Sequence, residues 1–203
     1  VWISTFHSMC VRILRQHINT LDPRFNQNFS IYADTESEKV VKTLLASENV
    51  SDDKIKKNVL FHLSKMKNGN IPFIKYKQDI AYDRDAALIS KIMAGYQNTL
   101  TENNALDFDD LLVKTYELFT THPEVLERYS SRFRFILVDE FQDTNDIQFK
   151  FLKLISSKWN NIFVVGDEDQ CIYSWRGADS KNMMRFIKEF GCENVIKLEQ
   201  NYR

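Results

Sequence analysis

The sequence predicts an α/β protein in which a parallel sheet is interrupted by a mostly helical insertion. After Asn104, short apolar segments alternate with helical stripes, a pattern typical of parallel strands that helices cover on both faces. Between Phe25 and Asn104 the apolar residues follow helical spacing instead. This helical stretch covers roughly eighty residues, which is long enough for a separate subdomain.

The first elements are expected to be a strand and a helix. Residues 1–3, Val-Trp-Ile, form an apolar run that predicts a strand already under way, and therefore an N-terminus cut from a longer chain. Thr5 or Ser8 can begin a helix that ends before Asp22-Pro23. Four apolar residues give this helix one buried face: Val11, Ile13, Leu14 and Ile18.

The helices of the insertion are predicted from caps and breakers. Asp34 or Thr35 is placed as an N-cap, with Glu38 completing a capping box. The turn-forming residues 68–72, Asn-Gly-Asn-Ile-Pro, end the next helix, and residues 86–100 supply another.

Three pairs of helix and strand follow the insertion. Apolar stripes predict helices over residues 108–119, 147–155 and 182–190. Short apolar runs predict strands over residues 133–138, 162–165 and 195–198. The chain therefore divides into a first sheet portion over residues 1–20, the helical insertion over residues 21–104 and the remainder of the sheet over residues 105–203.

Composition excludes several classes of protein. The chain has 203 residues, of which 43% are hydrophobic, so it can bury a core. No apolar run approaches the roughly eighteen residues of a membrane helix, and we expect a cytoplasmic protein without a membrane partner. A net charge of -1 argues against coating nucleic acid by bulk positive charge. The three cysteines lie far apart, which favours reduced thiols over a disulfide or zinc site.

Charge is unevenly distributed along the chain. Seven lysines and no acidic residue occur from Lys54 to Lys77. This lysine run fits either a solvated helical face or a surface for the DNA backbone, and the charge pattern leaves both open. Carboxylates gather instead at residues 139–146 and 167–169, directly after two predicted strands.

The first acidic group suggests magnesium chemistry. Functional groups of a parallel sheet gather past the carboxyl ends of its strands. An apolar strand that ends in Asp139-Glu140 is the arrangement in which the Asp holds magnesium through water and the next carboxylate orients an attacking water. Asp143 or Asn145 can cap the following helix, and for Asp143 and Asp146 capping and functional interpretations both stay open.

The second acidic group leads into a loop with aromatic residues. Gly166 permits a sharp turn, and the neutral amide of Gln170 can sense a phosphate or a water. Tyr173, Trp175 and Arg176 follow. Aromatic residues beside an arginine suit a platform for single-stranded nucleic acid, since stacking contributes about 1 to 3 kcal/mol per base. Taken alone, the two aromatic residues also fit ordinary packing.

Taken together, five segments resemble motifs of the UvrD/PcrA/Rep family of superfamily 1 DNA helicases. Residues 138–145 (VDEFQDTN), 165–178 (VGDEDQCIYSWRGA) and 198–203 (LEQNYR) are similar to motifs II, III and IV, in the family's order and spacing. Residues 5–8 (TFHS) resemble motif Ib, and residues 106–112 (LDFDDLL) resemble the segment that re-enters the first RecA-like subdomain. Five motifs in order argue against coincidence.

The resemblance implies a fold and a function. The sheet portions would belong to RecA-like subdomain 1A, and the helical insertion would be subdomain 1B, which makes its lysine run a plausible surface for DNA. ATP and Mg²⁺ would be the cofactors. The partners would be single-stranded DNA, single-strand to duplex junctions and accessory proteins of repair or replication. Movement along DNA would run 3′ to 5′.

The resemblance also assigns residues to the ATP site. Asp139 would hold magnesium, and Glu140 would be the catalytic base that orients the water. Gln170 would sense the γ-phosphate, Tyr202 would stack on adenine and Arg203 would reach the γ-phosphate.

DNA contacts are implied at two places. Phe6 and His7 would border the strand, whereas Tyr173, Trp175 and Arg176 would form the loop that couples DNA to the nucleotide.

One expected part is absent from the sequence. No Gly-x-x-x-x-Gly-Lys-Ser/Thr occurs, so nothing in this chain can wrap nucleotide phosphates with backbone N–H groups and a lysine. We therefore expect activity in a longer parent and an inactive fragment that binds ATP and DNA weakly. Two alternatives are the motor subunit of a helicase-nuclease complex, with a nuclease domain beyond Arg203, and a non-catalytic DNA-binding module.

Overall fold

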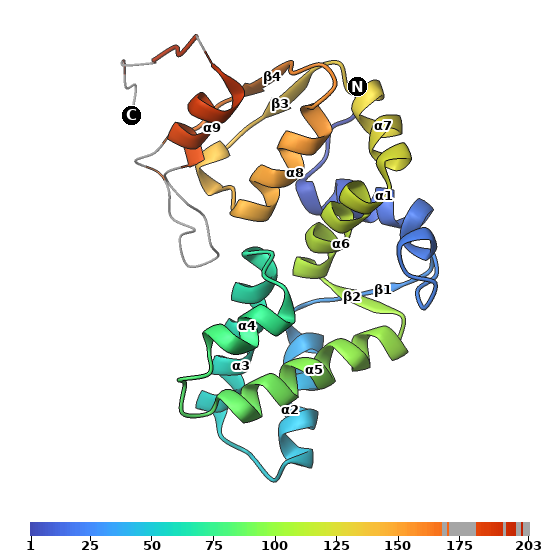
Figure 1. Ribbon diagram of the computed structural model, residues 1–203, viewed down its shortest axis with the longest axis vertical. Coiled ribbons are helices and arrows are strands. Elements are labelled where there is room, and N and C mark those ends of the chain that lie inside the picture. The colour runs from blue at the N-terminus through green and yellow to red at the C-terminus, as the bar shows by residue number, and fades with distance from the viewer. Residues whose placement is uncertain (168–169, 171–181, 193, 198–199, 201–203) are drawn as a thin grey trace.

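The computed structural model describes residues 1–167, 170, 182–192, 194–197 and 200 (Figure 1). The helices are α1 (Phe6–Leu21), α2 (Asp34–Ser47), α3 (Asp53–Asn68), α4 (Phe73–Asp79), α5 (Ala86–Glu102), α6 (Phe108–Thr121), α7 (Pro123–Arg132), α8 (Asp146–Ser156) and α9 (Asn182–Phe190). The strands are β1 (Ser30–Tyr32), β2 (Ala105–Asp107), β3 (Ile136–Val138) and β4 (Ile162–Val164), and a 3-10 turn, η1 (Phe141–Asp143), follows β3. None of the described helices has the length and apolar character needed to cross a membrane.

The strands form two parallel pairs. β1 aligns Ile31 with Leu106 of β2, and β3 aligns Leu137 with Phe163 of β4. Parallel neighbours need a long crossover between them. Helices α2 to α5 form the first crossover and α8 lies in the second. The predicted α/β class with parallel pairing is confirmed, although each strand has only three residues and helices dominate the described chain.

Two predicted strands do not form. Residues 1–5 and residues 195–197 have no strand structure, and residue 198 lies outside the described residues. A strand requires a neighbour that supplies hydrogen-bond partners. Val1 and Ile3 are instead largely exposed. Apolar composition without such a neighbour is therefore an insufficient signal for a strand.

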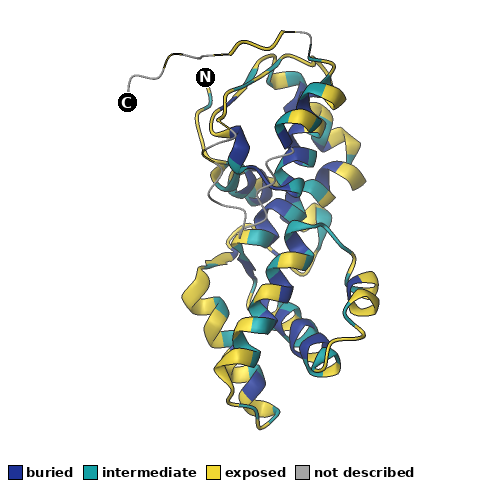
Figure 2. Cartoon of the chain, turned by 90° about the vertical axis from the view of Figure 1, so that its left-hand side faces the viewer, coloured by how far each residue is buried: buried dark blue, intermediate teal, exposed yellow. Residues whose placement is uncertain are grey.

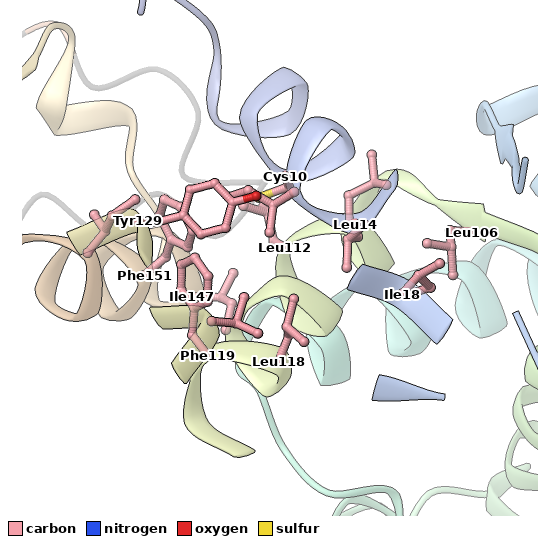
Figure 3. Packing of buried hydrophobic residues seen from close by; sticks show 14 of the residues in the cluster. Cys10, Leu14, Ile18, Leu106, Leu112, Leu118, Phe119, Tyr129, Ile147 and Phe151 are labelled. Atoms are coloured by element: carbon pink, nitrogen blue, oxygen red, sulfur yellow. The ribbon is translucent and has the colours of Figure 1, made fainter. Parts of the chain in front are cut away.

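The largest core lies among α1, α6, α7 and α8 (Figure 3). α1 begins after an N-cap at Thr5, one of the two predicted starts, and ends before Asp22 as predicted. Its buried residues follow helical spacing: Cys10, Ile13, Leu14 and Ile18. Phe119 stacks on Phe151 across this core, with ring centroids 5.7 Å apart. Burial raises the pKa of the Cys10 thiol to about 12, so this free cysteine is an unreactive packing residue.

A second core lies within residues 33–104, which we call the helical module, together with Ala105 of β2. Its helices form the lower part of Figure 1, and buried residues occur in this part as well as in the upper one (Figure 2). β1 enters the module beside β2, which leaves it. The predicted capping box with Glu38 is wrong, because Ala33 is the N-cap of α2 and donates its N–H to Glu36 Oε2 at 3.1 Å. The box residue is three positions after the cap, and the cap lies earlier than predicted.

A third core lies under one face of β3 and β4. Phe141, Phe149 and Phe186 pack there, and the rings of Phe141 and Phe186 meet with centroids 5.3 Å apart. The opposite face is open, because Leu137 is 76% exposed and Phe163 is 57% exposed. This packing holds η1 against α9 at the carboxyl ends of both strands.

One member of the lysine run is buried. Lys67 is 4% exposed, and its Nζ lies 2.6 Å from Asp107 Oδ2 and 2.8 Å from Asp110 Oδ1. Burial disfavours the ammonium, but the charges of Asp110 and Asp107 outweigh burial and raise the pKa of Lys67. We call Lys67, Asp107 and Asp110 the buried ion cluster. It joins the end of α3 to the start of α6, so Lys67 belongs neither to a solvated face nor to a DNA-facing surface.

Asp109→Asn is expected to stabilise the protein at neutral pH. Burial, and after it the charge of Asp107, raise the pKa of Asp109 to about 6. The pKa of an unfolded Asp is about 3.9, so the folded state holds the proton of Asp109 more tightly than the unfolded state does. The stabilisation from this proton is fully present below about pH 3.9 and is lost as the pH rises through about 6. The pKa difference sets an upper limit of about 3 kcal/mol on the lost free energy of unfolding. The effect should be smaller than this limit, because Asp109 is partly exposed.

Urea unfolding at several pH values measures this effect. Between pH 5 and 7.5 the wild type should lose about 1 kcal/mol that Asp109→Asn retains. Asp79→Asn, which changes an exposed acid of the helical module, serves as the control and should keep the pH slope of the wild type. An identical slope in Asp109→Asn and the wild type would contradict the prediction.

Candidate functional site

The carboxyl ends of β3 and β4 bring the two acidic groups together. Val165 donates its N–H to Val138 O at 2.8 Å, and Phe141 donates its N–H to Val165 O at 2.9 Å. These bonds continue the parallel register beyond the strands. The residues after Val138 and after Val165 therefore lie at one edge, as the sequence predicts.

Glu140 has an unusual backbone conformation at this edge. Its φ of 50° and ψ of 44° lie in the left-handed region. The other described non-glycine residues with positive φ are all asparagines, which tolerate this region better than glutamate does. Two hydrogen bonds hold the conformation: Glu140 N–H to Asp139 Oδ1 at 3.0 Å, and Gln142 Nε2 to Glu140 Oε2 at 2.6 Å. Strained backbone of this kind is typical of functional sites.

The buried amide of Gln142 links the two acidic groups. Its Nε2 donates to Glu140, and its Oε1 accepts the N–H of Asp167 at 3.0 Å. Gln142 is 2% exposed, so its amide is shielded from water. Sequence reasoning gave no role to this residue. The available signal is its position two residues after Glu140 within the motif.

Gln170 extends the connection on the side of β4. Its Nε2 donates to Asp167 Oδ2 at 2.5 Å, and its backbone N–H donates to Asp167 O at 3.1 Å. Glu140, Gln142, Asp167 and Gln170 are thus joined by successive hydrogen bonds. With Asp139 they form what we call the strand-end cluster, which contains every predicted site residue of the ATP site that the structure describes.

Gly166 is needed for close approach. A Cβ at this position would lie 2.7 Å from Gln142 Oε1 and 3.0 Å from Met183 Cε. The backbone of Gly166 does not have the positive φ that favours glycine, so the predicted role in a sharp turn is replaced by one in packing. A side chain here would push the Gln142 amide away from Asp167.

Gly166→Ala is expected to destabilise the protein by about 1 to 3 kcal/mol, because the new methyl group would press on the buried Gln142 amide. Thermal unfolding measures the change. Gly95→Ala is the matched control, since a Cβ there meets only the side chain of Leu44 at 3.2 Å and alanine favours a helix interior. If both variants unfold at the wild-type temperature, the Gln142 contact is not as tight as described.

The residues around Asp139 fit a magnesium ion that takes one or two carboxylate ligands from this chain and the others from water and phosphate oxygens. Asp139 and Glu140 are exposed carboxylates, and Asp143 has a buried Oδ1 with no hydrogen-bond partner in the described part of the chain. Magnesium favours one or two carboxylates together with water and phosphate oxygens. No group of three or more acidic, histidine or cysteine side chains suited to hold a metal alone occurs among the described residues.

The structure separates capping from the strand-end cluster. Asn145 is the N-cap of α8 and accepts the N–H of Gln148 at 3.0 Å, so neither Asp143 nor Asp146 caps this helix. Asp146 pairs with Lys150 and Arg185 instead. Burial opposes its ionisation, but the hydrogen bonds from Lys150 and Arg185 outweigh burial and lower the pKa of Asp146. Asp146 therefore has a structural partner set of its own.

The predicted DNA-contacting residues differ in their surroundings. Phe6 packs edge to face against Phe151 at 6.3 Å and borders two cores, so packing explains its position. The His7 ring meets the Phe108 ring at 5.7 Å, and Phe108 is 45% exposed. Five further predicted site residues lie outside the described residues: Tyr173, Trp175, Arg176, Tyr202 and Arg203.

Comparison with known proteins identifies the family. The UvrD/REP helicase N-terminal domain matches residues 1–191. The ATP-dependent DNA helicase PcrA of Staphylococcus aureus is 44% identical over 204 aligned positions, and that of Staphylococcus epidermidis is 42% identical. Each alignment covers 100% of this chain and 28% of the relative, so the chain spans little more than a quarter of these helicases. The chain belongs to the UvrD/REP helicase family.

Proposed function

We propose that this chain is the part of an ATP-dependent DNA helicase that carries the magnesium-binding and DNA-coupling residues of the first RecA-like subdomain. The longer protein would use ATP hydrolysis to move 3′ to 5′ along single-stranded DNA and to unwind duplex DNA in repair or replication. DNA would be met in the cytoplasm of a bacterial cell. Membership of the helicase family supports the DNA helicase assignment.

The observation that carries this proposal is the strand-end cluster. An exposed carboxylate pair after β3 is connected through one buried amide to the loop after β4. Such a connection lets the residues around Glu140 and Gln170 move together rather than independently. A protein that converts hydrolysis into movement needs a link of this kind between the reacting phosphate and the DNA-binding loop.

The residues after β3 would prepare the attacking water. Asp139 would hold magnesium, and the bound ion would neutralise the negative charge of the phosphates. Glu140 would accept a hydrogen bond from the water and orient it, and Gln142 keeps the Glu140 carboxylate in place from the buried side.

Residues of the later motifs would report the state of the nucleotide. Gln170 would contact the γ-phosphate, and Arg203 would stabilise the charge that develops there. Tyr202 would stack on adenine. The chain contains no phosphate-wrapping glycine loop, so we propose that hydrolysis is a property of the longer protein and that this chain alone binds ATP weakly.

DNA contacts would be shared between two elements. The start of α1, with Phe6 and His7, would border single-stranded DNA. Three residues of the loop would contact bases: Tyr173, Trp175 and Arg176. A shift of this loop on DNA would also move Gln170. Residues 1–20 and 105–203 would form subdomain 1A, and residues 21–104 would form subdomain 1B beside the duplex. Phe25 and Phe29 lie beyond the predicted boundary at residue 21, yet they pack in the same core as α1 and α6. The boundary therefore stays a prediction.

Strand displacement tests the proposed function. The longer protein is given ATP, Mg²⁺ and a duplex with either a 3′ or a 5′ single-stranded tail. We expect displacement only from the 3′-tailed substrate and only with ATP. Displacement from the 5′ tail alone would overturn the direction, and absence of displacement from both substrates would overturn the helicase assignment.

A further inference from the structure

We propose that the hydrogen bond between Asn68 and Asn145 is a positioning contact through which the helical module sets the geometry of the strand-end cluster. This inference rests on the proposed function, because the cluster is taken to be the hydrolysis site. It assigns a role to two residues outside the predicted site. Asn68 is the last residue of α3, and Asn145 lies five residues after Glu140.

The orientation of the Asn68 amide is set by its partners. Its Nδ2 donates to Ser64 Oγ at 2.9 Å and to Asp109 Oδ1 at 3.2 Å. Both acceptors therefore face the nitrogen, and the oxygen is left for Asn145, whose Nδ2 donates to it at 2.7 Å. Asn145 uses its own oxygen to accept the N–H of Gln148. Each amide thus has one possible orientation in this network.

The end of α3 is firmly held where the helical module joins α6. Lys67, directly before Asn68, belongs to the buried ion cluster and is bound to the start of α6. The Tyr96 hydroxyl adds bonds to Asp107 and to Ser37, each 2.9 Å long, which connect α5 and α2 to the same cluster. A displacement of the module therefore carries Asn68 with it.

The segment from Glu140 to Asn145 is equally tight on the side of the site. Asp143 donates its N–H to Glu140 O at 3.0 Å, and Thr144 Oγ1 donates to Phe141 O at 2.7 Å. Asn182, at the start of α9, donates to Thr144 O at 2.7 Å. Phe141 and Thr144 are buried. Movement of Asn145 is consequently transmitted to Glu140 through a short closed turn.

The Asn68 contact goes beyond helix capping. Asn145 caps α8 with its side-chain oxygen and its backbone N–H, whereas the bond from Nδ2 reaches a residue 77 positions earlier in the chain. All seven lysines of the run lie on α3 and α4, and five of them are exposed: Lys54, Lys57, Lys65, Lys75 and Lys77. A phosphate backbone held by Lys54, Lys57 and Lys65 would act on the helix that ends at Asn68.

The test compares Asn68→Ala with Ser64→Ala in the longer protein. Ser64→Ala removes one of the two acceptors of Asn68 Nδ2, but Asp109 still orients this amide and the bond to Asn145 stays in place. We expect Asn68→Ala to reduce the stimulation of ATP hydrolysis by single-stranded DNA roughly fivefold or more, with the rate without DNA unchanged. Ser64→Ala should keep the wild-type stimulation. Wild-type stimulation in Asn68→Ala would overturn the proposal.

Asn145→Ser provides a second variant that keeps the N-cap but removes the Nδ2 donor that reaches Asn68. If the two asparagines act through each other, the double variant loses no more stimulation than the worse single variant. Multiplied losses would show independent effects and would overturn the proposal. An equal fall of the rates with and without DNA in Asn68→Ala, together with a lower unfolding temperature, would show a structural role only and would overturn it as well.

Amide hydrogen exchange separates this inference from the proposed function. In Asn68→Ala the amides of residues 141–146 should exchange faster than in the wild type, whereas Ser64→Ala should leave them unchanged. This readout does not depend on hydrolysis. A wild type without DNA-stimulated hydrolysis would remove the proposed function, while unchanged exchange in Asn68→Ala would remove the positioning contact.

Discussion

Replacing Lys67 by Met is expected to lower the free energy of unfolding by about 3 to 5 kcal/mol. The variant keeps the volume of the side chain but leaves Asp107 and Asp110 without their cation. Asp110 is 3% exposed, so water cannot replace the ammonium. Each carboxylate also caps α6 through the backbone N–H of the other, which prevents either from turning away. Urea unfolding at pH 7 measures the loss.

Two further variants separate lost charge from lost packing. Lys65→Met changes an exposed lysine of the same helix and should alter stability by no more than about 0.5 kcal/mol. Lys67→Met combined with Asp107→Asn and Asp110→Asn removes the whole charged group and should recover most of the stability, because a neutral group has no uncompensated charge. If Lys67→Met alone is as stable as the wild type, the buried ion cluster does not hold α3 to α6.

Replacing Glu140 by Gln in the longer protein is expected to reduce DNA-stimulated ATP hydrolysis by about 10² to 10⁴. The amide oxygen of the new side chain can still accept the hydrogen bond from Gln142, so the cluster keeps its geometry. The variant cannot accept a proton from water. Nucleotide binding should therefore be retained while the rate falls.

Steady-state rates and nucleotide titrations together distinguish a lost base from a lost site. Glu124→Gln, an exposed acid at the start of α7, is the matched control and should have the wild-type rate. Retained hydrolysis in Glu140→Gln would contradict the role of this residue. A parallel loss of nucleotide binding would instead indicate that Glu140 holds the nucleotide.

Local signals predict most of the described helices well. The N-cap at Thr5 and the residues Asp22-Pro23 bound α1 as expected, and the apolar stripe after residue 181 matches α9. The cap acts within one turn of helix and the stripe within one short helix, so neither signal depends on distant residues. The pairing of β1 with β2 joins segments about seventy-five positions apart, with three residues in each strand. Such a pairing leaves little local pattern to recognise.

The site was predicted in part, for a similar reason. Asp139, Glu140 and Gln170 follow apolar strands, and the structure brings Glu140 and Gln170 into one hydrogen-bonded chain. The bridging role of Gln142 depends on how closely β4 passes η1, which the sequence does not express. Likewise, the charge of the lysine run is evident from the sequence, but the burial of Lys67 is not. Its partners, Asp107 and Asp110, lie forty or more positions later in the chain.

The central claim is that the strand-end cluster belongs to a site at which single-stranded DNA stimulates ATP hydrolysis. The most direct test is the ATPase rate of the longer protein with and without single-stranded DNA. We expect strong stimulation by DNA in the presence of Mg²⁺. A protein that binds DNA but shows no stimulated hydrolysis would contradict the claim and would make the chain part of a DNA-binding module.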